Sequence, residues 1–252
     1  MTADRPPTAR SLRAQPIIAL DVPSLEAALA LLGRLGPEAD FVKVGLELFT
    51  AEGPRVVERL RRDGRRVFLD LKLHDIPNTV KGAALRAAAM DVQLLTVHGY
   101  GGAAMVEAAV EGAGAGTGIL VVTVLTSFER SALGVALGRE VPELGAEVVR
   151  LAGVASAARA HGIVCSGQEV AAAVSTYPEL RPLVPGIRLA GGASHDQARV
   201  VTPEQAAGDG ATYLVLGRAV TAAEDPAAVL ASIRETLKAG SGRLEGEPKA
   251  GS

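Results

Sequence analysis

Residues 67–79 read VFLDLKLHDIPNT, an apolar strand that ends in charged residues. Residues 65 to 72 are rich in β-formers and lie between an Asp-Gly pair and the turn from Asp75 to Pro77, which predicts one strand. Because alternate side chains of a strand share a face, Asp70 and Lys72 are expected to point the same way. Asp75 follows the strand, so it can reach the lysine only through a turn or from a second copy of the chain.

A lysine held between carboxylates can serve either chemistry or structure. At about 4 Å and an effective dielectric constant near 20, each lysine–carboxylate attraction is worth roughly 4 kcal/mol before desolvation is subtracted. Such pairs would fix the direction of the Lys72 ammonium group and leave it ready to donate a proton. The pattern D-x-K-x-x-D alone is equally compatible with a structural ion pair at a strand end, so the choice depends on the rest of the chain.

Composition limits the class of protein. The chain has 252 residues, of which 48% are hydrophobic, enough for one α/β barrel or two small domains. A net charge of −2 and an aromatic content of 3% argue against a nucleic-acid-binding surface. The single Cys165 cannot form an intrachain disulfide, and neither a signal peptide nor a membrane span is evident. We therefore expect a cytoplasmic protein with no nucleic-acid or membrane partner.

Short β-branched segments alternate with segments of helical period along the chain. Helices are predicted over 24–35 and 53–62, for instance, where apolar residues recur at i, i+3 and i+4. Eight βα units without a break in composition favour an α/β fold of the (β/α)₈ TIM barrel type, in one domain, over a doubly wound sheet. The predicted strands cover residues 16–21, 41–48, 66–72, 92–98, 119–126, 162–166, 182–187 and 212–217.

The barrel is predicted to form a catalytic domain over residues 15–238. Residues 1–14 mix proline, arginine and small polar residues, and residues 239–252 consist mainly of glycine, serine and charged residues. Neither segment shows a periodic pattern, so we expect a flexible N-terminal arm and a flexible C-terminal tail.

Polar residues collect at the predicted carboxyl ends of the strands, where enzymes of this fold keep their active sites. Strand ends are commonly polar, so some of these residues could be turn-formers without a chemical role. A cluster that combines lysines, arginines and acidic groups is harder to explain in that way. The residues at or near these ends are Asp21, Lys43, Asp70, Lys72, His98, Thr126, Ser166, Arg188 and Arg218.

The loops after the seventh and eighth strands predict a phosphate site. Gly217 would let the backbone approach an anion closely, the N–H groups of the next helix would point at it, and Arg218 offers a planar fork of donors. Arg188 and Gln197 flank a glycine-rich stretch, residues 190–193, which is expected to close over the ligand as a lid. For an isolated Gly-Gly pair, a surface turn would be the simpler interpretation.

Three further features are interpreted as structural. Cys165 has no general base at a recognisable spacing, so it is expected to be a small buried residue rather than a nucleophile. His161 and His195 lie in predicted loops and are expected to be exposed to solvent. A cluster of arginines at the end of helix 53–62 is interpreted as a solvated patch that complements the helix dipole; its members are Arg59, Arg61, Arg62, Arg65 and Arg66.

The run from Asp70 to Thr79, DLKLHDIPNT, resembles the signature of the orotidine 5'-phosphate decarboxylase family. Matching segments occur in the family's order over nearly the whole chain. Position 73 is often aromatic in related sequences and is leucine here, which should affect only packing. The other segments are ALD at 19–21, VKVG at 42–45, TVH at 96–98, VLTS at 124–127, PGIR at 185–188 and GR at 217–218.

The resemblance implies a (β/α)₈ barrel that forms a homodimer with shared active sites and uses neither a metal nor an organic cofactor. The reaction would convert orotidine 5'-phosphate to uridine 5'-phosphate and carbon dioxide in pyrimidine nucleotide synthesis.

The resemblance also implies a role for each site residue. Lys72 would donate a proton to C6 of the pyrimidine, and Asp70 would lie against the departing carboxylate. Asp75 and Thr79 would come from the partner subunit. The remaining substrate contacts would be Asp21 and Lys43 to the ribose, Thr126 to the pyrimidine edge, and Arg188, Gln197, Gly217 and Arg218 in the phosphate region.

Two alternatives remain open. A magnesium-dependent phosphosugar decarboxylase or aldolase of the same barrel group would share the D-x-K-x-x-D pattern, and Glu47 could then serve as a metal ligand. The segment from His74 to Thr79 favours the orotidylate branch. A catalytically silent protein that binds phosphoribosyl ligands is the other alternative, which the intact aspartate–lysine–aspartate triad disfavours.

Overall fold

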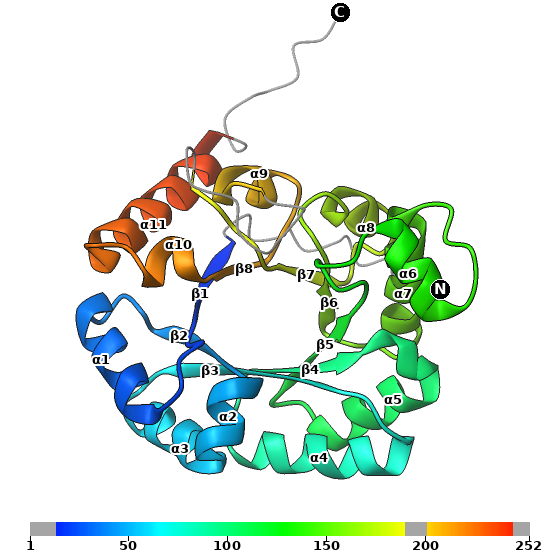
Figure 1. The fold of residues 1–252 in the computed structure, drawn as a ribbon, viewed down its shortest axis with the longest axis horizontal. Coiled ribbons are helices and arrows are strands. Elements are labelled where there is room, and N and C mark those ends of the chain that lie inside the picture. Colours follow the sequence, from blue (N-terminus) through cyan, green and yellow to red (C-terminus); the bar gives the residue numbers. More distant parts are fainter. Residues whose placement is uncertain (1–13, 190–200, 244–252) are drawn as a thin grey trace, which may run out of the picture.

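The computed structural model describes residues 14–189 and 201–243 of the chain. Eight parallel strands pair in sequence order, and the last pairs with the first, so the sheet closes into a barrel. Helices surround this ring on its outside (Figure 1). The predicted α/β barrel is therefore confirmed.

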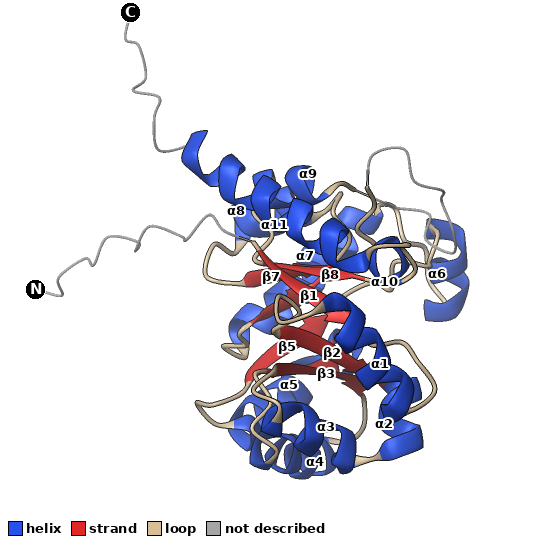
Figure 2. Ribbon diagram, turned by 90° about the vertical axis from the view of Figure 1, so that its left-hand side faces the viewer, coloured by secondary structure: helices blue, strands red, loops and turns tan. Residues whose placement is uncertain are grey.

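The strands are short and the helices enclose them, as the side view shows (Figure 2). The strands are β1 Gln15–Ala19, β2 Phe41–Gly45, β3 Arg66–Leu73, β4 Leu94–His98, β5 Gly118–Val122, β6 Gly162–Val164, β7 Arg181–Val184 and β8 Tyr213–Leu216. The helices are α1 Leu25–Leu35, α2 Leu46–Glu52, α3 Pro54–Arg62, α4 Pro77–Ala89, α5 Gly102–Ala113, α6 Arg130–Leu137, α7 Leu144–Ala157, α8 Val170–Thr176, α9 Pro203–Gly208, α10 Arg218–Thr221 and α11 Pro226–Arg243, and a 3-10 turn, η1, spans Gly99–Gly101.

Two sets of buried apolar side chains hold the barrel together. Along β1, Ile17 belongs to one set and Ile18 to the other, because successive side chains of a strand point to opposite faces. Burial on both faces explains why the strands are continuous apolar runs in the sequence. The smaller set fills the barrel interior and consists of Ile17, Ala19, Phe41, Phe68, Leu94, Leu120, Leu183, Tyr213 and Val215.

Local signals set the bounds of α1. The Ser24 hydroxyl oxygen accepts a hydrogen bond from the Ala27 N–H at 3.2 Å and so caps the first turn. Gly36, with a φ of 72°, ends the helix in a conformation that favours glycine. The face that packs on the strands carries Ala28, Leu31, Leu32 and Leu35. The helix predicted over 24–35 is confirmed.

Several strands were predicted to extend further at their carboxyl ends than they do. β2 stops at Gly45, and α2 begins at Leu46, where the prediction extended a strand to residue 48. The alternating pattern of Leu46, Glu47 and Leu48 imitates a strand, but Leu48 is fully buried while Leu46 and Glu47 are exposed. Likewise β5 stops at Val122 rather than at residue 126. Near the barrel mouth the chain leaves the hydrogen-bonded ladder, and this departure depends on tertiary packing rather than on local pattern.

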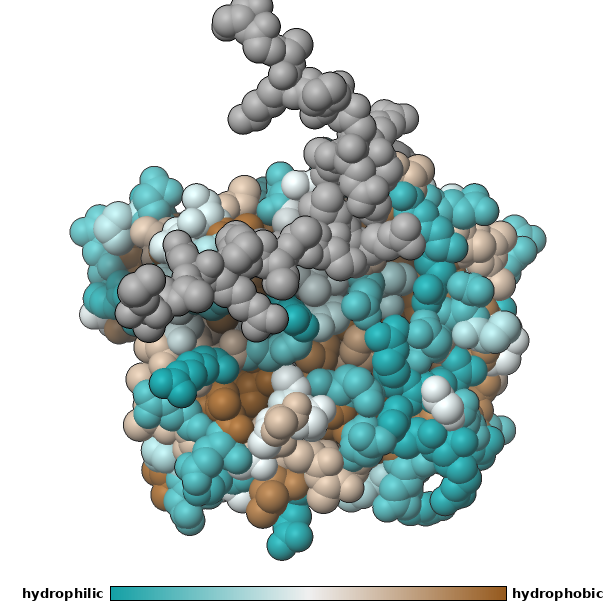
Figure 3. Space-filling model, turned by 180° about the vertical axis from the view of Figure 1, so that it is seen from behind, coloured by the Kyte–Doolittle hydropathy of each residue, from teal (hydrophilic) through white to brown (hydrophobic). Residues whose placement is uncertain are grey.

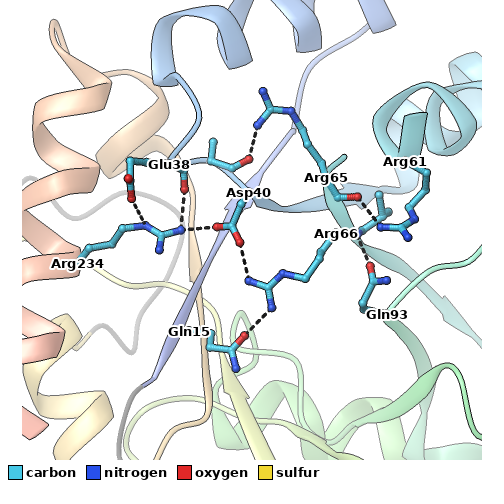
Figure 4. Close-up of polar contacts among 10 residues, drawn as sticks. Gln15, Glu38, Asp40, Arg61, Arg65, Arg66, Gln93 and Arg234 are labelled. Atoms are coloured by element: carbon cyan, nitrogen blue, oxygen red, sulfur yellow. Dashed lines mark hydrogen bonds and ion pairs between the residues drawn. The ribbon is translucent and has the colours of Figure 1, made fainter. Parts of the chain in front are cut away.

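An ion-pair network joins the amino ends of the strands (Figure 4). The Asp40 carboxylate accepts hydrogen bonds from Arg66 of β3 at 2.8 Å and from Arg234 of α11 at 2.5 Å. Burial alone would raise the pKa of Asp40, but the two arginines lower it. Arg66 also donates to Gln15 of β1 at 2.8 Å and lies 4.4 Å above the Phe41 ring. The network therefore ties the last helix to the first three strands, at the end of the barrel where structural roles are usual.

The predicted solvated arginine patch is only partly correct. Arg59 and Arg61 do lie in the last turn of α3, where cations complement the helix dipole. Arg61, however, pairs with Asp91, and Arg65 donates to the carbonyl oxygen of Ala39. Arg61 thus joins α3, and Arg65 the turn after it, to neighbouring loops instead of facing solvent alone.

The limits of the barrel differ slightly from the prediction. Ala14, placed in the N-terminal arm, is buried, and α11 continues past residue 238 to Arg243. The rest of the two predicted tails, residues 1–13 and 244–252, lies outside the described residues.

Hydrophilic side chains cover most of the face shown in Figure 3, with a smaller apolar area near its middle. Among the residues that the structure describes, the large apolar side chains that are exposed are Leu46, Ile76, Leu85 and Val135. No helix in the described part of the chain combines the length and the apolar character that a membrane crossing requires.

The prediction that His161 is exposed to solvent is wrong. It is half-buried just before β6, with Nε2 2.9 Å from the hydroxyl oxygen of Tyr213. Burial foremost, and the charge of Arg181 in addition, lower the pKa of His161 to about 4. Cys165 is buried as predicted, and His195 lies outside the described residues.

We expect His161 to make the fold sensitive to mild acid. The unfolded chain takes up a proton at His161 near pH 6.5 but the folded protein only near pH 4, so stability present above pH 6.5 is lost as the pH falls towards 4. The loss due to this ring is on the order of 3 kcal/mol at most. Urea unfolding at about pH 7.5 and about pH 5 measures it. His161→Gln should lose less stability than the parent between these values, and equal losses would contradict the assignment.

Candidate active site

The carboxyl ends of the strands surround a cavity of about 300 Å³. Apolar side chains such as Phe68 and Leu183 form its deeper wall, and charged groups stand around them. Most of the predicted site residues line it, namely Asp21, Lys43, Asp70, Lys72, Thr126, Arg188, Gly217 and Arg218.

A chain of ion pairs runs along one side of this cavity. Lys43 donates a hydrogen bond to Asp21 at 2.7 Å, and its Nζ lies 3.8 Å from Oδ2 of Asp70. Lys72 donates to both carboxylate oxygens of Asp70 at 2.9 Å. The side chains of Lys43 and Asp70 are only 10% and 14% exposed, so solvent screens the central pair little. Asp70 thus lies between two ammonium groups.

Gly45 leaves room for the outer pair. A Cβ atom at this position would lie 2.9 Å from Nζ of Lys43 and 3.3 Å from Oδ1 of Asp21. A larger residue at the end of β2 would therefore push the two charged groups apart.

The strand that carries Asp70 and Lys72 is irregular. The pairing of β3 with β4 shifts register between Leu69 and Leu73, and Lys72 has a φ of 50°. Simple alternation predicted that the two charged side chains share a face. They do meet, but in a backbone conformation that costs on the order of 1 kcal/mol for a residue other than glycine. The surrounding contacts must offset this strain.

Thr96, in β4, stabilises the irregular segment and was not among the predicted site residues. Its fully buried hydroxyl donates to Oδ1 of Asp70 and accepts from the backbone N–H of Lys72, both at 2.9 Å. One side chain therefore orients the carboxylate and holds the backbone of the lysine. A polar residue in the middle of the apolar run 94–97 is the signal that could have identified it.

The opposite side of the cavity carries the predicted phosphate residues. Gly217 precedes α10 and has open space where a Cβ atom would be, so its backbone is accessible from the cavity. The helix that Arg218 begins spans only Arg218–Thr221, so its dipole is small. The buried Nε of Arg188 has no hydrogen-bond partner among the described residues. Gln197 and the expected lid, residues 190–193, lie outside the described residues.

Asp75 does not reach Lys72 of its own chain. It is exposed, and its Oδ1 accepts a hydrogen bond from the N–H of Ile76 at 2.6 Å. No ion pair joins it to a lysine within the part of the chain that the structure describes. Thr79, in the first turn of α4, is exposed as well. Neither residue lines the cavity.

The remaining polar residues near the strand ends have different surroundings. Thr126 lines the cavity from the loop after β5 rather than from the strand itself. Ser166 is buried away from the cavity lining and donates to Glu169. His98 also lies outside the lining, and its ring stacks between those of His74 and Tyr100.

The sequence matches a family model described as the Orotidine 5'-phosphate decarboxylase / HUMPS family over residues 14–233. The chain belongs to this family. The match covers all eight strands and not only the aspartate–lysine motif.

Individual members of the family are similar over most of the chain. An orotidine 5'-phosphate decarboxylase of Anaeromyxobacter sp. (strain K) is 55% identical over 222 residues, which are 87% of this chain and 96% of the relative. One from Cutibacterium acnes is 49% identical over 230 residues, 90% and 97% of the two chains. The crystal structure of orotidine 5'-phosphate decarboxylase from Lactobacillus acidophilus superposes with a TM-score of 0.79 at 35% identity, covering 89% of this chain and 99% of that one.

Proposed function

We propose that this chain converts orotidine 5'-phosphate to uridine 5'-phosphate and carbon dioxide, with Lys72 as the proton donor to C6 of the pyrimidine. The observation that carries the proposal is the Lys43–Asp70–Lys72 arrangement in the cavity of a barrel of this family. The description of the family names two branches, orotidine 5'-phosphate decarboxylase first and HUMPS second. Full-length relatives that are 49% and 55% identical are named orotidine 5'-phosphate decarboxylases, which favours the first branch.

The chemistry requires a charge placed beside C6. Loss of carbon dioxide leaves a carbanion orthogonal to the π system of the ring, so no simple electron sink exists. The Lys72 ammonium group gains interaction energy as negative charge moves from the carboxylate onto carbon, which stabilises the transition state more than the ground state. Its proton then passes to C6 and completes uridine 5'-phosphate.

Asp70 has two tasks in this mechanism. It accepts hydrogen bonds from Lys72 and from Thr96, and these hold the ammonium group in place. It also lies where the substrate carboxylate would bind, so that repulsion between the two carboxylates is relieved when carbon dioxide leaves.

The rest of the substrate fits the remaining polar groups. We assign Asp21 and Lys43 to the ribose hydroxyls and Thr126 to the pyrimidine edge. The phosphate is assigned to Arg188, whose buried Nε has no hydrogen-bond partner among the described residues, together with Gln197, Gly217 and Arg218. Binding energy gained at the phosphate, far from the bond that breaks, can be expressed in turnover.

A homodimer with shared active sites is part of the proposal. Asp75 and Thr79 are assigned to the active site of the partner subunit, because both are exposed and neither lines the cavity of its own chain. Ile76, next to Asp75, is 67% exposed, and Leu46 at the start of α2 is 55% exposed. A second copy of the chain would cover these exposed apolar side chains. A cytoplasmic location is also proposed, since a single buried cysteine suits a reducing compartment.

An absorbance assay with orotidine 5'-phosphate, with and without a chelator, tests the function. We expect turnover that survives exhaustive chelation, because two ammonium groups already neutralise Asp70 and would repel a divalent cation. Glu47, the ligand suggested for a metal-dependent enzyme, is exposed and does not line the cavity. Turnover that required added magnesium would favour the phosphosugar branch. Binding of uridine 5'-phosphate without any turnover of the substrate would favour a silent binding protein.

Arg218→Ala is expected to weaken binding of uridine 5'-phosphate far more than binding of uridine. A charge-assisted hydrogen bond to phosphate contributes about 1.5–3 kcal/mol, which corresponds to roughly tenfold to a hundredfold in affinity. Titration calorimetry with both ligands measures the difference. Equal losses for the two would remove Arg218 from the phosphate site.

A further inference from the structure

Three aromatic rings stack in a row beside the barrel mouth, and the proposed reaction does not use them. His98, at the end of β4, lies between His74 and Tyr100. Its ring centroid is 5.5 Å from that of His74 and 5.4 Å from that of Tyr100, and the ring planes differ by 22° and 24°. These distances are typical of aromatic rings in contact. We refer to His74, His98 and Tyr100 as the ring stack.

One end of the ring stack is attached to α7. The Arg150 guanidinium lies 5.9 Å from the centroid of the Tyr100 ring. Arg150 donates two hydrogen bonds to the Glu147 carboxylate, at 3.1 and 2.7 Å, and Arg139 donates two more at 2.8 Å. The bonds from Arg150 foremost lower the pKa of Glu147 to about 2, so this buried carboxylate stays charged. Because the buried Glu147 carboxylate accepts hydrogen bonds from both arginines, it fixes the position of Arg150 beside the Tyr100 ring.

The other end of the ring stack holds the segment that carries Asp75. Every residue from His74 to Thr79 is exposed. Among the described residues, the contact of His74 with His98 is the only hydrogen bond, ion pair or ring contact between a side chain of this segment and the barrel. The backbone of η1 also approaches the ring, since a Cβ atom on Gly101 would lie 3.3 Å from Cδ2 of His74.

The position of His98 between two rings calls for a planar ring and not for a group that gains or loses a proton. Burial, followed by the charges of His74 and Lys72, lowers the pKa of His98. A neutral ring can stack without charge repulsion. Its Nδ1 is buried and has no hydrogen-bond partner among the described residues. An aromatic ring without nitrogen atoms should therefore serve equally well at this position.

We infer that the ring stack is a positioning device that holds the segment 74–79 of one subunit at the angle needed to deliver Asp75 to the active site of the other subunit. His74, His98 and Tyr100 are then positioning residues that act on the partner's reaction. The inference rests on the shared active site of the proposed function. Because a misplacement of about 1 Å can lower turnover about a hundredfold, a loosened ring stack should reduce kcat and leave substrate binding nearly unchanged.

Matched variants of His98 test the role of the ring. His98→Leu removes the planar ring and is expected to lower kcat by about tenfold to a hundredfold with KM changed less than about twofold. His98→Phe keeps a ring and should retain most of the parental kcat. His74→Leu lies at the exposed end of the ring stack and should share the loss, so it carries the test if His98→Leu does not fold. A loss in His98→Phe as large as that in His98→Leu, or a rise in KM in place of the fall in kcat, would overturn the inference.

Subunit mixing determines in which active site the ring stack acts. Consider a hybrid dimer of one Lys72→Ala chain and one His98→Leu chain. The only intact Lys72 belongs to the His98→Leu chain. The Asp75 that completes this site comes from the Lys72→Ala chain, whose ring stack is intact. This site should turn over at the parental rate. A hybrid as slow as the His98→Leu homodimer would show that the ring stack acts on the lysine of its own chain, contrary to the inference.

A parallel mixture of Lys72→Ala and Asp75→Asn chains tests the shared site without touching the ring stack. If this mixture recovers activity and the His98→Leu mixture does not, the inference about the ring stack is wrong, while the shared active site remains supported. If neither mixture recovers, the shared active site of the proposed function fails, and the inference fails with it.

Discussion

Replacing Lys72 with alanine is expected to abolish turnover while the barrel stays folded. The substitution removes both the proton donor and the charge that stabilises the carbanion. Losses of about a hundredfold to ten-thousandfold for a proton donor and a hundredfold to a thousandfold for a charge-stabilising donor are usual, so we expect a combined loss of at least about ten-thousandfold. Stability should change little, because the side chain lies at the barrel mouth and is 34% exposed.

The measurement compares kcat/KM and thermal unfolding of Lys72→Ala with those of the parent and of Lys238→Ala. Lys238 is an exposed lysine of α11 beside Gln15, at the amino ends of the strands, so its loss should leave activity unchanged. Binding of uridine 5'-phosphate by Lys72→Ala would show that the cavity is intact. Activity of Lys72→Ala within about tenfold of the parent would rule out its assignment as proton donor.

A mixture of two nearly inactive proteins, Lys72→Ala and Asp75→Asn, is expected to be active. In a hybrid dimer, two-fold symmetry places both defects in one site and leaves the other site with an unmodified Lys72 and an unmodified Asp75. Random exchange makes about half of the dimers hybrid, each with one working site of two, so recovery should approach roughly a quarter of parental activity.

Two controls make this result decisive. Each variant mixed with itself should stay inactive, and chains that carry different affinity tags should co-purify, which proves that subunits have exchanged. Confirmed exchange without recovery would mean that Lys72 and Asp75 act within one chain, and the dimer would no longer be needed for catalysis.

The architecture could be predicted because local patterns specify it. Eight apolar strands separated by segments of helical period favour a closed parallel sheet with helices outside. Residues such as Ser24 and Gly36 set the bounds of a helix, Ser24 through its side-chain cap and Gly36 through its backbone conformation. The alternating segment from Leu46 to Leu48 shows the limit of this approach. Its pattern fits a strand as well as a short helix, and only burial in the folded chain distinguishes them.

The cavity could be predicted for a related reason. The carboxyl ends of the strands of a parallel barrel meet at one face, so polar residues at those ends must lie close together. Thr96 was missed because its role depends on the register shift between β3 and β4 and on the left-handed backbone of Lys72. These are properties of strand pairing, which the sequence of a single strand does not determine.

The sequence by itself therefore determined the barrel, the family and most of the residues around the cavity. Only the tertiary structure decided that His161 packs against Tyr213, that Thr96 bonds to Asp70 and Lys72, and that the ring stack forms. The physical reason is the distance along the chain. Such contacts join residues from different strands and loops, and they arise only once the barrel has closed in one register, whereas helix caps and strand patterns depend on neighbouring residues alone.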